Sequence, residues 1–405
     1  MSSTMSVVPP AFVPCTEESW RAPWPMYRAL RDHDPVHRVR HDDPAEDYWV
    51  LSRYTHVYDA VRDHETFSSA NGLTIRYDEL EAAGLADNPP MVMQDPPQHT
   101  AFRRSVSRGF TPRQVADVEP EVRRFVVERI ERLRAEGGGD IVTQLFKPLP
   151  TMVVAHYLGV PESDRDRFDV WTDLVVEASA NGNPLHAQQA IAEMMVYFTE
   201  LIDRRRREPA DDTISHLLAA GTGVAADDYA GIIEILGFAF TMVAGGNDTT
   251  TGLLGGAIQM LARQPEQRAL LTADPSRIPA AVEEFARLTS PVQGLCRTTT
   301  RDVDLDGTVI PAGRKTLLLY GSANRDDREF GPDADELNVL RDPKQILTFA
   351  HGAHHCLGAA AARLQARVAL TELLSRCPDF DVDIDAVRYA PGYYVRRPTT
   401  VPFML

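Results

Sequence analysis

The sequence predicts a mainly α-helical fold with a smaller β region, and three observations support this prediction. Amphipathic helical spacing covers residues 112–136, which end at three glycines, and residues 187–208, which end before a proline. An apolar helical pattern runs over residues 232–261, and residues 359–374 are strongly helix-forming. Clusters of strand-forming residues are short and lie nearer the two ends of the chain.

The first elements follow a small, proline-rich segment, residues 1–14, which we expect to be a loose arm. Residues 25–33 predict a short helix. Residues 36–39 and 48–52 then cluster strand formers around the turn-rich stretch 41–47, which predicts an antiparallel pair of strands.

The remaining elements are a long loop and a late strand region. Residues 68–97 have little periodicity and many turn formers, and so long a structureless stretch is usually functional, so we expect part of a binding site there. Residues 299–311 and 315–320 predict strands, and residues 325–344 predict an irregular meander. Because the sequence contains no internal repeat or linker, we expect one domain over residues 1–405.

Composition indicates an ordinary globular chain with a sizeable core, and it narrows the classes of partner. Hydrophobic residues make up 43% and charged residues 25% of the 405 residues. Lys and Arg number 42 against 58 Asp and Glu, and the net charge of −16 repels phosphate backbones and anionic lipid surfaces. Nucleic-acid binding and membrane adhesion are therefore disfavoured.

The sequence also bears on location and redox state. Apolar runs such as residues 232–243 are interrupted before they reach the roughly 18 to 20 residues of a membrane span, so we expect no membrane anchor. Residues 1–10 carry no basic start followed by an apolar stretch, which favours a cytoplasmic location. The four cysteines include no Cys-x-x-Cys pair, which disfavours a disulfide framework or a zinc knuckle.

The most informative segment is residues 349–358, Phe-Ala-His-Gly-Ala-His-His-Cys-Leu-Gly, which places Cys356 where a glycine-rich loop enters a helix. Unpaired backbone N–H groups and the positive end of the helix dipole lower the pKa of a thiol there, which favours the thiolate. Gly352 would let the backbone turn close under a flat ligand, and Gly358 would let the helix approach it. A lone cysteine is more often a small buried residue, but the flanking glycines and histidines favour a chemical role.

Three chemistries could use this thiolate. A Cys–His nucleophile would take His354 or His355 as its base, although neighbours in a tight loop point in different directions. A zinc site would need more ligands at close spacing than the nearby histidines supply. The third is an axial thiolate ligand on haem iron.

The segment resembles the signature Phe-Gly-x-Gly-x-His-x-Cys-x-Gly of the cytochrome P-450 superfamily of haem-thiolate monooxygenases, with Ala350 in place of one glycine. The resemblance implies the fold of that superfamily, with haem b (iron protoporphyrin IX) held between the long central helix and the helix after the cysteine loop. It implies Cys356 as the axial ligand of the haem iron, Phe349 beside the haem and His354 on a haem propionate. Alanine tolerates a positive φ poorly, so we expect a minor local adjustment at Ala350 without loss of haem.

A Glu-x-x-Arg motif lies upstream of the cysteine loop. Glu284 and Arg287 share one helix face, where each can pair with the other and with a third partner. The motif is common on surface helices, but here it resembles the family pair that ties this helix to the meander before the cysteine loop. The resemblance implies a structural role, with Arg325 as the expected third member.

Residues 245–250, Gly-Gly-Asn-Asp-Thr-Thr, interrupt the apolar helical pattern of residues 232–261. Consecutive glycines cost a helix roughly 1 kcal/mol each, which a kinked, cofactor-facing groove would offset. Close packing against a neighbouring helix would explain the glycines but not Asp248 beside Thr249. This pair resembles the catalytic acid–alcohol pair of the family, in which the threonine hydroxyl acts on dioxygen and the acid relays protons through water.

Basic residues near the loop have two readings. His99 and Arg103 lie four residues apart on one face of a helix that begins after prolines, where two cationic donors can bind a carboxylate. The alternative is a solvated basic stripe that continues through Arg104 and Arg108. The resemblance implies that His99, Arg103 and Arg297 contact haem propionates.

Residues 23–36, 90–97, 245–249 and 319–326 look like the actinobacterial family numbered one hundred and thirty. The resemblance implies a monooxygenase that inserts one oxygen atom from O2 into a small apolar organic substrate with two electrons. Because the chain has no flavin or iron–sulfur motif, the implied partners are a ferredoxin and an NAD(P)H-dependent ferredoxin reductase. The expected docking face is basic and contains Arg103, Arg104, Arg108, Arg113, Arg363 and Arg367.

Substrate-contacting residues are matched to the family, and most are apolar or aromatic, as in most small-molecule pockets. Ordinary core packing is an equal alternative for each of them. They are Leu73, Ile75, Met91, Val92, Met242, Val243, Val292, Leu295, Tyr393 and Tyr394.

Rival functions stay open. A peroxide-using haem enzyme and a haem sensor or carrier are two alternatives, but neither would need Asp248 and Thr249, so the presence of this pair counts against them. A cysteine hydrolase is a further alternative, and a colourless purified protein would support it.

Overall fold

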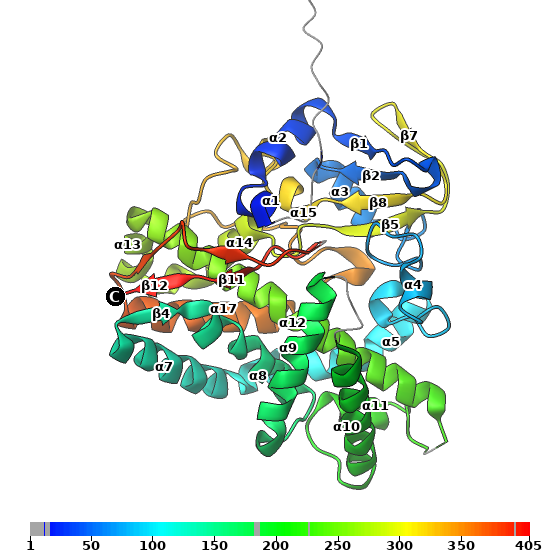
Figure 1. The fold of residues 1–405 in the computed structure, drawn as a ribbon, viewed down its shortest axis with the longest axis horizontal. Helices are drawn as coiled ribbons and strands as arrows, with labels where there is room; N and C mark the ends of the chain where they lie inside the picture. Colours follow the sequence, from blue (N-terminus) through cyan, green and yellow to red (C-terminus); the bar gives the residue numbers. More distant parts are fainter. Residues whose placement is uncertain (1–11, 13–16, 182–186, 226, 393) are drawn as a thin grey trace, which may run out of the picture.

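The computed structural model describes residues 12, 17–181, 187–225, 227–392 and 394–405 (Figure 1). A sheet-bearing part contains strands from the beginning and the end of the chain, and a larger helical part contains the middle of the chain and the helix after Cys356. The prediction of a mainly α-helical fold with a smaller β region is confirmed. Of the expected arm over residues 1–14, only Phe12 is described, and it is buried in a cluster with Tyr27 and Leu30.

The main sheet joins segments that are far apart in the sequence. Its strand order is β1-β2-β8-β5-β3, in which β2 and β8 are parallel and the other neighbours antiparallel. The expected first pair is confirmed, with Val36 opposite Leu51. The strands are β1 Val36–Val39, β2 Tyr48–Leu51, β3 Phe67–Ser68, β5 Leu295–Thr299 and β8 Lys315–Leu318.

The helical part is built around α12 (Tyr229–Arg263), which packs against α8 (Pro148–Tyr157), α9 (Arg165–Asn181) and α14 (Ile278–Thr289) (Figure 1). Buried aliphatic residues of α7 and α17 join those of α12 and α14 in one large cluster. The other helices are α1 Glu17–Arg21, α2 Trp24–His33, α3 Tyr54–Arg62, α5 Gln98–Val106, α6 Pro112–Asp117, α7 Glu119–Glu136, α10 Gln188–Arg207, α11 Thr213–Ala219, α13 Pro265–Ala273, α15 Tyr320–Ala323 and α17 Ala359–Arg376.

Residues 112–136 form two helices instead of the single one expected. α6 ends at Asp117 and α7 begins at Glu119. Pro120 in the first turn of α7 has no N–H to donate, and its ring clashes with the carbonyl of a preceding helical turn, so one continuous helix is not favoured. The expected stop is confirmed, because Gly137 ends α7 with a left-handed φ of 74°.

The helix expected over residues 232–261 is present as α12, and it runs without a break through residues 245–250. One expectation about its composition is wrong. By length and composition the helix is apolar enough to cross a membrane, which corrects the expectation that no apolar run is long enough. Nearly every residue from Thr250 to Leu261 is buried, as expected of a core helix, which is apolar on several faces.

The predicted loop and meander are largely irregular. Residues 68–97 contain α4 (Glu79–Ala82) and one 3-10 turn, Met91–Met93, and residues 325–344 contain α16 (Asp327–Phe330). The remaining strands are β4 Gly138–Asp140, β6 Val303–Leu305, β7 Thr308–Ile310, β9 Asp381–Val382, β10 Arg388–Tyr389, β11 Pro398–Thr400 and β12 Pro402–Met404.

Candidate active site

The cysteine loop, residues 349–358, connects the meander to α17 and is closed by backbone hydrogen bonds. The Cys356 N–H donates to the Phe349 carbonyl at 2.8 Å, and the His355 N–H donates to the Gly352 carbonyl at 3.2 Å. Ala350 has a φ of +50° and Gly352 one of +70°. Ala350 therefore keeps the left-handed backbone that glycine adopts more easily.

Gly352 lies close to α3. A Cβ at this residue would lie 3.2 Å from the Val61 carbonyl oxygen and 3.3 Å from the Arg62 Cα, at the end of α3. The glycine therefore lets the loop approach α3. At Gly358 a Cβ would meet no protein atom within 4 Å.

The Cys356 thiol does not gain the depressed pKa expected of a helix start. The residue is exposed on one side, but the protein around its other sides raises the pKa of the thiol. The N–H groups of Gly358 and Ala359 and the positive charges of Arg103 and Arg363 act in the opposite direction without outweighing this desolvation.

Four basic side chains gather next to this loop from three parts of the chain. His99 and Arg103 come from α5, Arg297 from β5 and His354 from the loop itself. The rings of His99 and His354 lie 4.1 Å apart between centroids. Burial, followed by the nearby positive charges of Arg297, His99 and Arg103, lowers the pKa of His354 to about 3. His354 is therefore neutral near pH 7, and the positive charge of the cluster lies on the two arginines.

Among the described residues, no carboxylate forms an ion pair with this cluster. His99 is 1% exposed, and neither of its ring nitrogens has a hydrogen-bond partner among the described residues. Asp95 is close enough to influence His99, but its carboxylate accepts from the Ser68 hydroxyl at 2.5 Å and from the Ser69 N–H at 2.9 Å. The buried His99 ring without a partner, beside two arginines and a thiol, suits a cofactor that carries carboxylates, so the residues fit haem with its two propionates.

The predicted acid–alcohol pair lies on α12. The Asp248 Oδ2 is 2.7 Å from the Arg397 Nε, and both side chains are largely buried. Burial raises the pKa of Asp248 to about 6 against the opposing effect of Arg397. The Thr249 hydroxyl donates to the Gly245 carbonyl at 3.0 Å, one helical turn earlier.

The two glycines of this motif have different surroundings. A Cβ at Gly246 would lie 2.9 Å from a methyl group of Val154, so close packing against α8 explains this glycine. A Cβ at Gly245 would meet no protein atom within 4 Å. The helix is also anchored to α8 through Asn247, whose side-chain oxygen accepts from the Thr151 hydroxyl at 2.9 Å.

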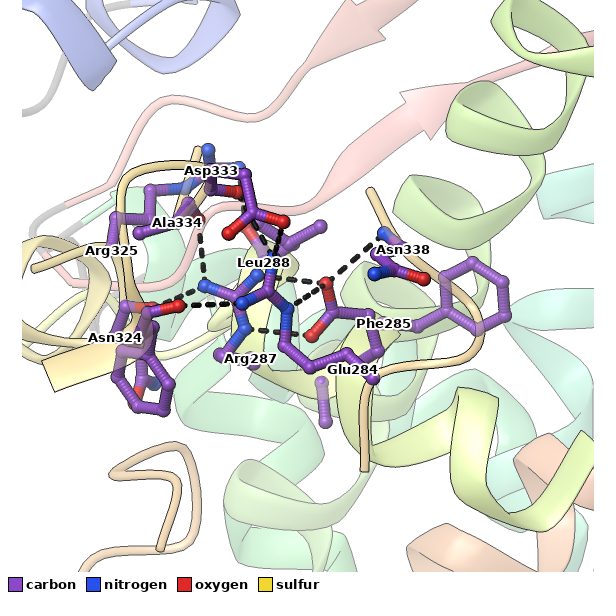
Figure 2. A network of polar contacts seen from close by, with 12 residues as sticks. Glu284, Phe285, Arg287, Leu288, Asn324, Arg325, Asp333, Ala334 and Asn338 are labelled. Atoms are coloured by element: carbon purple, nitrogen blue, oxygen red, sulfur yellow. Dashed lines mark hydrogen bonds and ion pairs between the residues drawn. The ribbon is translucent and has the colours of Figure 1, made fainter. Parts of the chain in front are cut away.

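Figure 2 shows the Glu-x-x-Arg pair within its network. Glu284 and Arg287 are fully buried and joined by two hydrogen bonds of 2.7 and 2.8 Å. Arg287 also donates at 2.7 Å to the carbonyls of Asn324 and Ala334, which ties α14 to the meander. The expected connection is therefore present, through backbone acceptors.

The third charged member differs from the expected one. Arg341 lies 3.2 Å from Glu284, whereas Arg325 donates to the Leu288 carbonyl at 2.8 Å and pairs with Asp335. Arg325 also stacks over the Trp24 ring, 3.7 Å from its centroid, and burial lowers its pKa to about 9. Its position on the meander places it beside α2 and not beside the Glu284 carboxylate.

The predicted substrate-contacting residues fall into three groups. Met91 and Val243 are buried in a core formed by α8 to α12, so core packing describes these two. Ile75, Met242, Val292 and Leu295 are half-buried and pack against the edges of core clusters. Leu73, Val92 and Tyr394 are half-buried as well, and Tyr393 lies outside the described residues.

Three of the half-buried segments converge. The Cys296 N–H donates to the Leu73 carbonyl and the Gln293 N–H to the Tyr394 carbonyl, each at 2.7 Å. Leu73 and Tyr394 therefore lie beside residues 292–296, which lead into β5. A cleft of about 400 Å³ between α7, α8 and α9, lined by residues such as Phe125, Arg129 and Asp169, contains none of the predicted site residues.

Two polar residues of this region were not predicted. Arg397 pairs with Asp248, and Arg341 pairs with Glu284. Both contacts join residues far apart in the sequence, so no local spacing predicts them. The only signal was an arginine pair, Arg396 and Arg397, inside an otherwise apolar C-terminal segment.

Comparison with known proteins agrees with this geometry. Residues 276–386 match the family model described as Cytochrome P450. The chain is 66% identical over 400 residues to Cytochrome P450 130 of Mycobacterium tuberculosis, with 98% of each chain covered. It is 34% identical over 386 residues to the vitamin D(3) 25-hydroxylase of Pseudonocardia autotrophica, with 95% of this chain and 94% of the relative covered.

A solved structure gives the same result. Cytochrome P450 CYP109Q5 from Chondromyces apiculatus matches with a TM-score of 0.84 and 34% sequence identity, over 96% of each chain. The chain therefore belongs to the cytochrome P450 family of haem-dependent monooxygenases, whose members use O2, a substrate and redox partners.

Proposed function

We propose that this cytochrome P450 inserts one oxygen atom from O2 into a small apolar organic substrate. The observation that carries the proposal is the cluster of His99, Arg103, Arg297 and His354 beside Cys356, with the buried His99 ring unpaired among the described residues. Cys356 would ligate the haem iron, and the four basic side chains would hold the propionates. Haem b, when bound, supplies the oxygen-activating chemistry that the side chains lack.

Phe349 would support the cysteine loop under the haem. Its ring is buried, and the Arg363 guanidinium lies 4.3 Å from its centroid. Arg363 is itself held by two hydrogen bonds to Glu283. This stack fixes the start of the loop relative to α14 and α17.

Asp248 and Thr249 would organise proton delivery. A carboxyl with a pKa of about 6 can both accept and release a proton near neutral pH, which a relay group requires. The Thr249 hydroxyl donates back to the helix and keeps its oxygen available as an acceptor.

The apolar half-buried residues support an apolar substrate. Leu73, Val292, Leu295 and Tyr394 come from three segments that meet at residues 292–296, where β5 begins. One relative is named for hydroxylating vitamin D(3), which is itself an apolar molecule. Each such contact favours a ligand by burying apolar surface.

An electron-donating ferredoxin and its NAD(P)H-dependent reductase are the proposed redox partners. The expected basic face is less positive than its sequence indicates, because Arg113 pairs with Asp117, Arg363 with Glu283 and Arg367 with Glu119. Arg104 is exposed and remains available for docking an acidic protein. The side chain of Arg108 is not among those that the structure describes.

We also propose a cytoplasmic location and a single folding domain over residues 1–405. The main sheet supports the second proposal, since it takes strands from residues 36–68 and 295–318 into one hydrogen-bonded unit. The close similarity to bacterial relatives along the whole chain is consistent with both.

The variant Thr249→Ala tests the oxygen-insertion proposal. It should retain haem and substrate binding, but release more hydrogen peroxide and less product per NAD(P)H consumed, because proton delivery no longer accompanies oxygen activation. The measurement uses a surrogate ferredoxin system and a substrate found by screening apolar molecules for a shift of the haem absorption band.

Thr199→Ala is the matched control. Thr199 makes the same bond to the carbonyl one turn earlier, at 2.8 Å, but lies on α10. It should lose a similar amount of stability with an unchanged ratio of product to peroxide. An unchanged ratio in Thr249→Ala as well would overturn the proton-delivery role.

A further inference from the structure

Arg397 belongs to none of the sequence motifs, yet it is the charged group in contact with Asp248. The Nε lies 2.7 Å from Oδ2, and the side chains are 12% and 14% exposed. The contact is an ion pair and not an aligned hydrogen bond, since the Arg397 Nε meets no hydrogen-bond geometry. Because the two charged groups are close together and largely buried, the attraction between them is strong. The carboxylate still keeps lone pairs free for a further donor.

The backbone around Arg397 is held on two sides. The Arg396 N–H donates to the Pro291 carbonyl at 2.7 Å, and Val395 forms an antiparallel bridge with Val292. The Arg397 carbonyl accepts from the Ala390 N–H at 3.1 Å. Arg397 is thus presented to α12 from a fixed segment, unlike a long side chain on an open surface.

The other groups that face Asp248 are weaker electrostatic partners. Lys147, which precedes α8, pairs at 2.9 Å with Asp173 of α9, and both are about half exposed, so their charges largely cancel. Tyr394 carries a neutral hydroxyl whose pKa is raised to about 12 by burial and by Asp248. Among the described residues, Arg397 is therefore the nearby positive charge that offsets the effect of burial on the Asp248 carboxylate.

We propose that Arg397 is the positioning residue of the proton relay, holding the buried Asp248 carboxylate ionised and in place on α12. This inference rests on the proposed function of Asp248. A proton taken up by Asp248 from water neutralises the carboxylate and weakens its hold on Arg397, and release of that proton restores the ion pair.

Infrared titration of the haem-loaded protein tests the proposal directly. The stretching band of the protonated Asp248 carboxyl is identified by its loss in Asp248→Asn. In the parent protein, the pH at which this band reaches half its full intensity, its titration midpoint, is expected near 6. Arg397→Gln should move the midpoint upward by about one pH unit or more, because the charged form loses its stabilising partner. Arg397→Lys, which keeps the charge, should restore most of the original midpoint.

Three controls separate positioning from a purely structural role. Lys147→Gln and Tyr394→Phe should move the midpoint less than Arg397→Gln, and haem content should not change in any variant. Arg397→Met keeps the apolar stem and is the second neutral variant if Arg397→Gln does not fold. A midpoint that both neutral variants leave unchanged, or move no further than Lys147→Gln does, would overturn the inference.

The titration needs neither substrate nor turnover. Its failure is therefore distinguishable from failure of the proposed function, which the product-to-peroxide ratio of Thr249→Ala tests independently.

Discussion

The Glu284 carboxylate and the Arg287 guanidinium have no exposed surface, so each depends on polar contacts with the protein. Glu284 also accepts from the Asn338 N–H and faces Arg341. Burying two charges is costly, and the pair is tolerated because its hydrogen bonds are nearly all satisfied. Its value is geometric, since it joins α14 to the meander that leads into the cysteine loop.

Removing the charge of Glu284 should therefore be severe. Glu284→Gln is expected to destabilise the protein by about 3 to 5 kcal/mol and to lower haem retention, because it leaves Arg287 buried without its counter-charge. Thermal unfolding and haem content measure both effects.

The neighbouring residue supplies the matched control. Glu283 pairs with Arg363 at a partly exposed position, so Glu283→Gln should cost only about 1 kcal/mol or less. Equal effects of the two substitutions would show that the Glu284 pair has no special role.

At the scale of elements, the cysteine loop shows how a motif can be kept with one unfavourable residue. Ala350 holds a φ of +50°, and the loop hydrogen bond from the Ala350 N–H to the Leu347 carbonyl is made at 2.9 Å. The loop therefore keeps its hydrogen bond although the left-handed backbone of Ala350 costs about 1 to 2 kcal/mol.

Ala350→Gly should relieve that strain. Glycine gives back roughly 0.5 to 1 kcal/mol through the greater entropy of the unfolded chain, so we expect a net stabilisation of about 1 kcal/mol or less. The melting temperature of the haem-loaded protein measures it. Ala353→Gly in the same loop, where φ is not positive, should instead destabilise; a loss of stability in both variants would refute the strain at Ala350.

Elements defined by local chemistry were predicted from the sequence, and those defined by distant packing were not. The stop of α7 at Gly137 and the first strand pair follow from residues next to one another. The need for a glycine at residue 246 comes from the close approach of Val154 of α8, which no local pattern contains.

At the scale of the whole molecule, the site is assembled from segments that no spacing relates. His99 and Arg103 were placed correctly on one helix, but their approach to His354 and Arg297 depends on the order of the sheet and the position of α5. The partners Arg341 and Arg397 were missed for the same reason, because an ion pair between distant residues leaves no periodic signal.

Where positive and negative charges lie on the surface of this chain, whose net charge is −16, depends on the fold as well as on the sequence. Several arginines of the expected basic face are neutralised by acidic residues brought to them by packing, as Arg367 is by Glu119. Docking of the proposed acidic ferredoxin would therefore depend on a few exposed charges, and it should weaken as ionic strength rises.

The absorption spectrum of the reduced protein with carbon monoxide, compared with that of Cys356→Ser, tests the central claim most directly. The parent protein should show a strongly red-shifted Soret band, which requires thiolate ligation. The variant should remain folded but bind little haem or hold an oxygen-ligated iron, because a hydroxyl is a much poorer anionic ligand than a thiolate, and the red-shifted band should be lost. An unaltered red-shifted band in Cys356→Ser would remove Cys356 from the site and contradict the account.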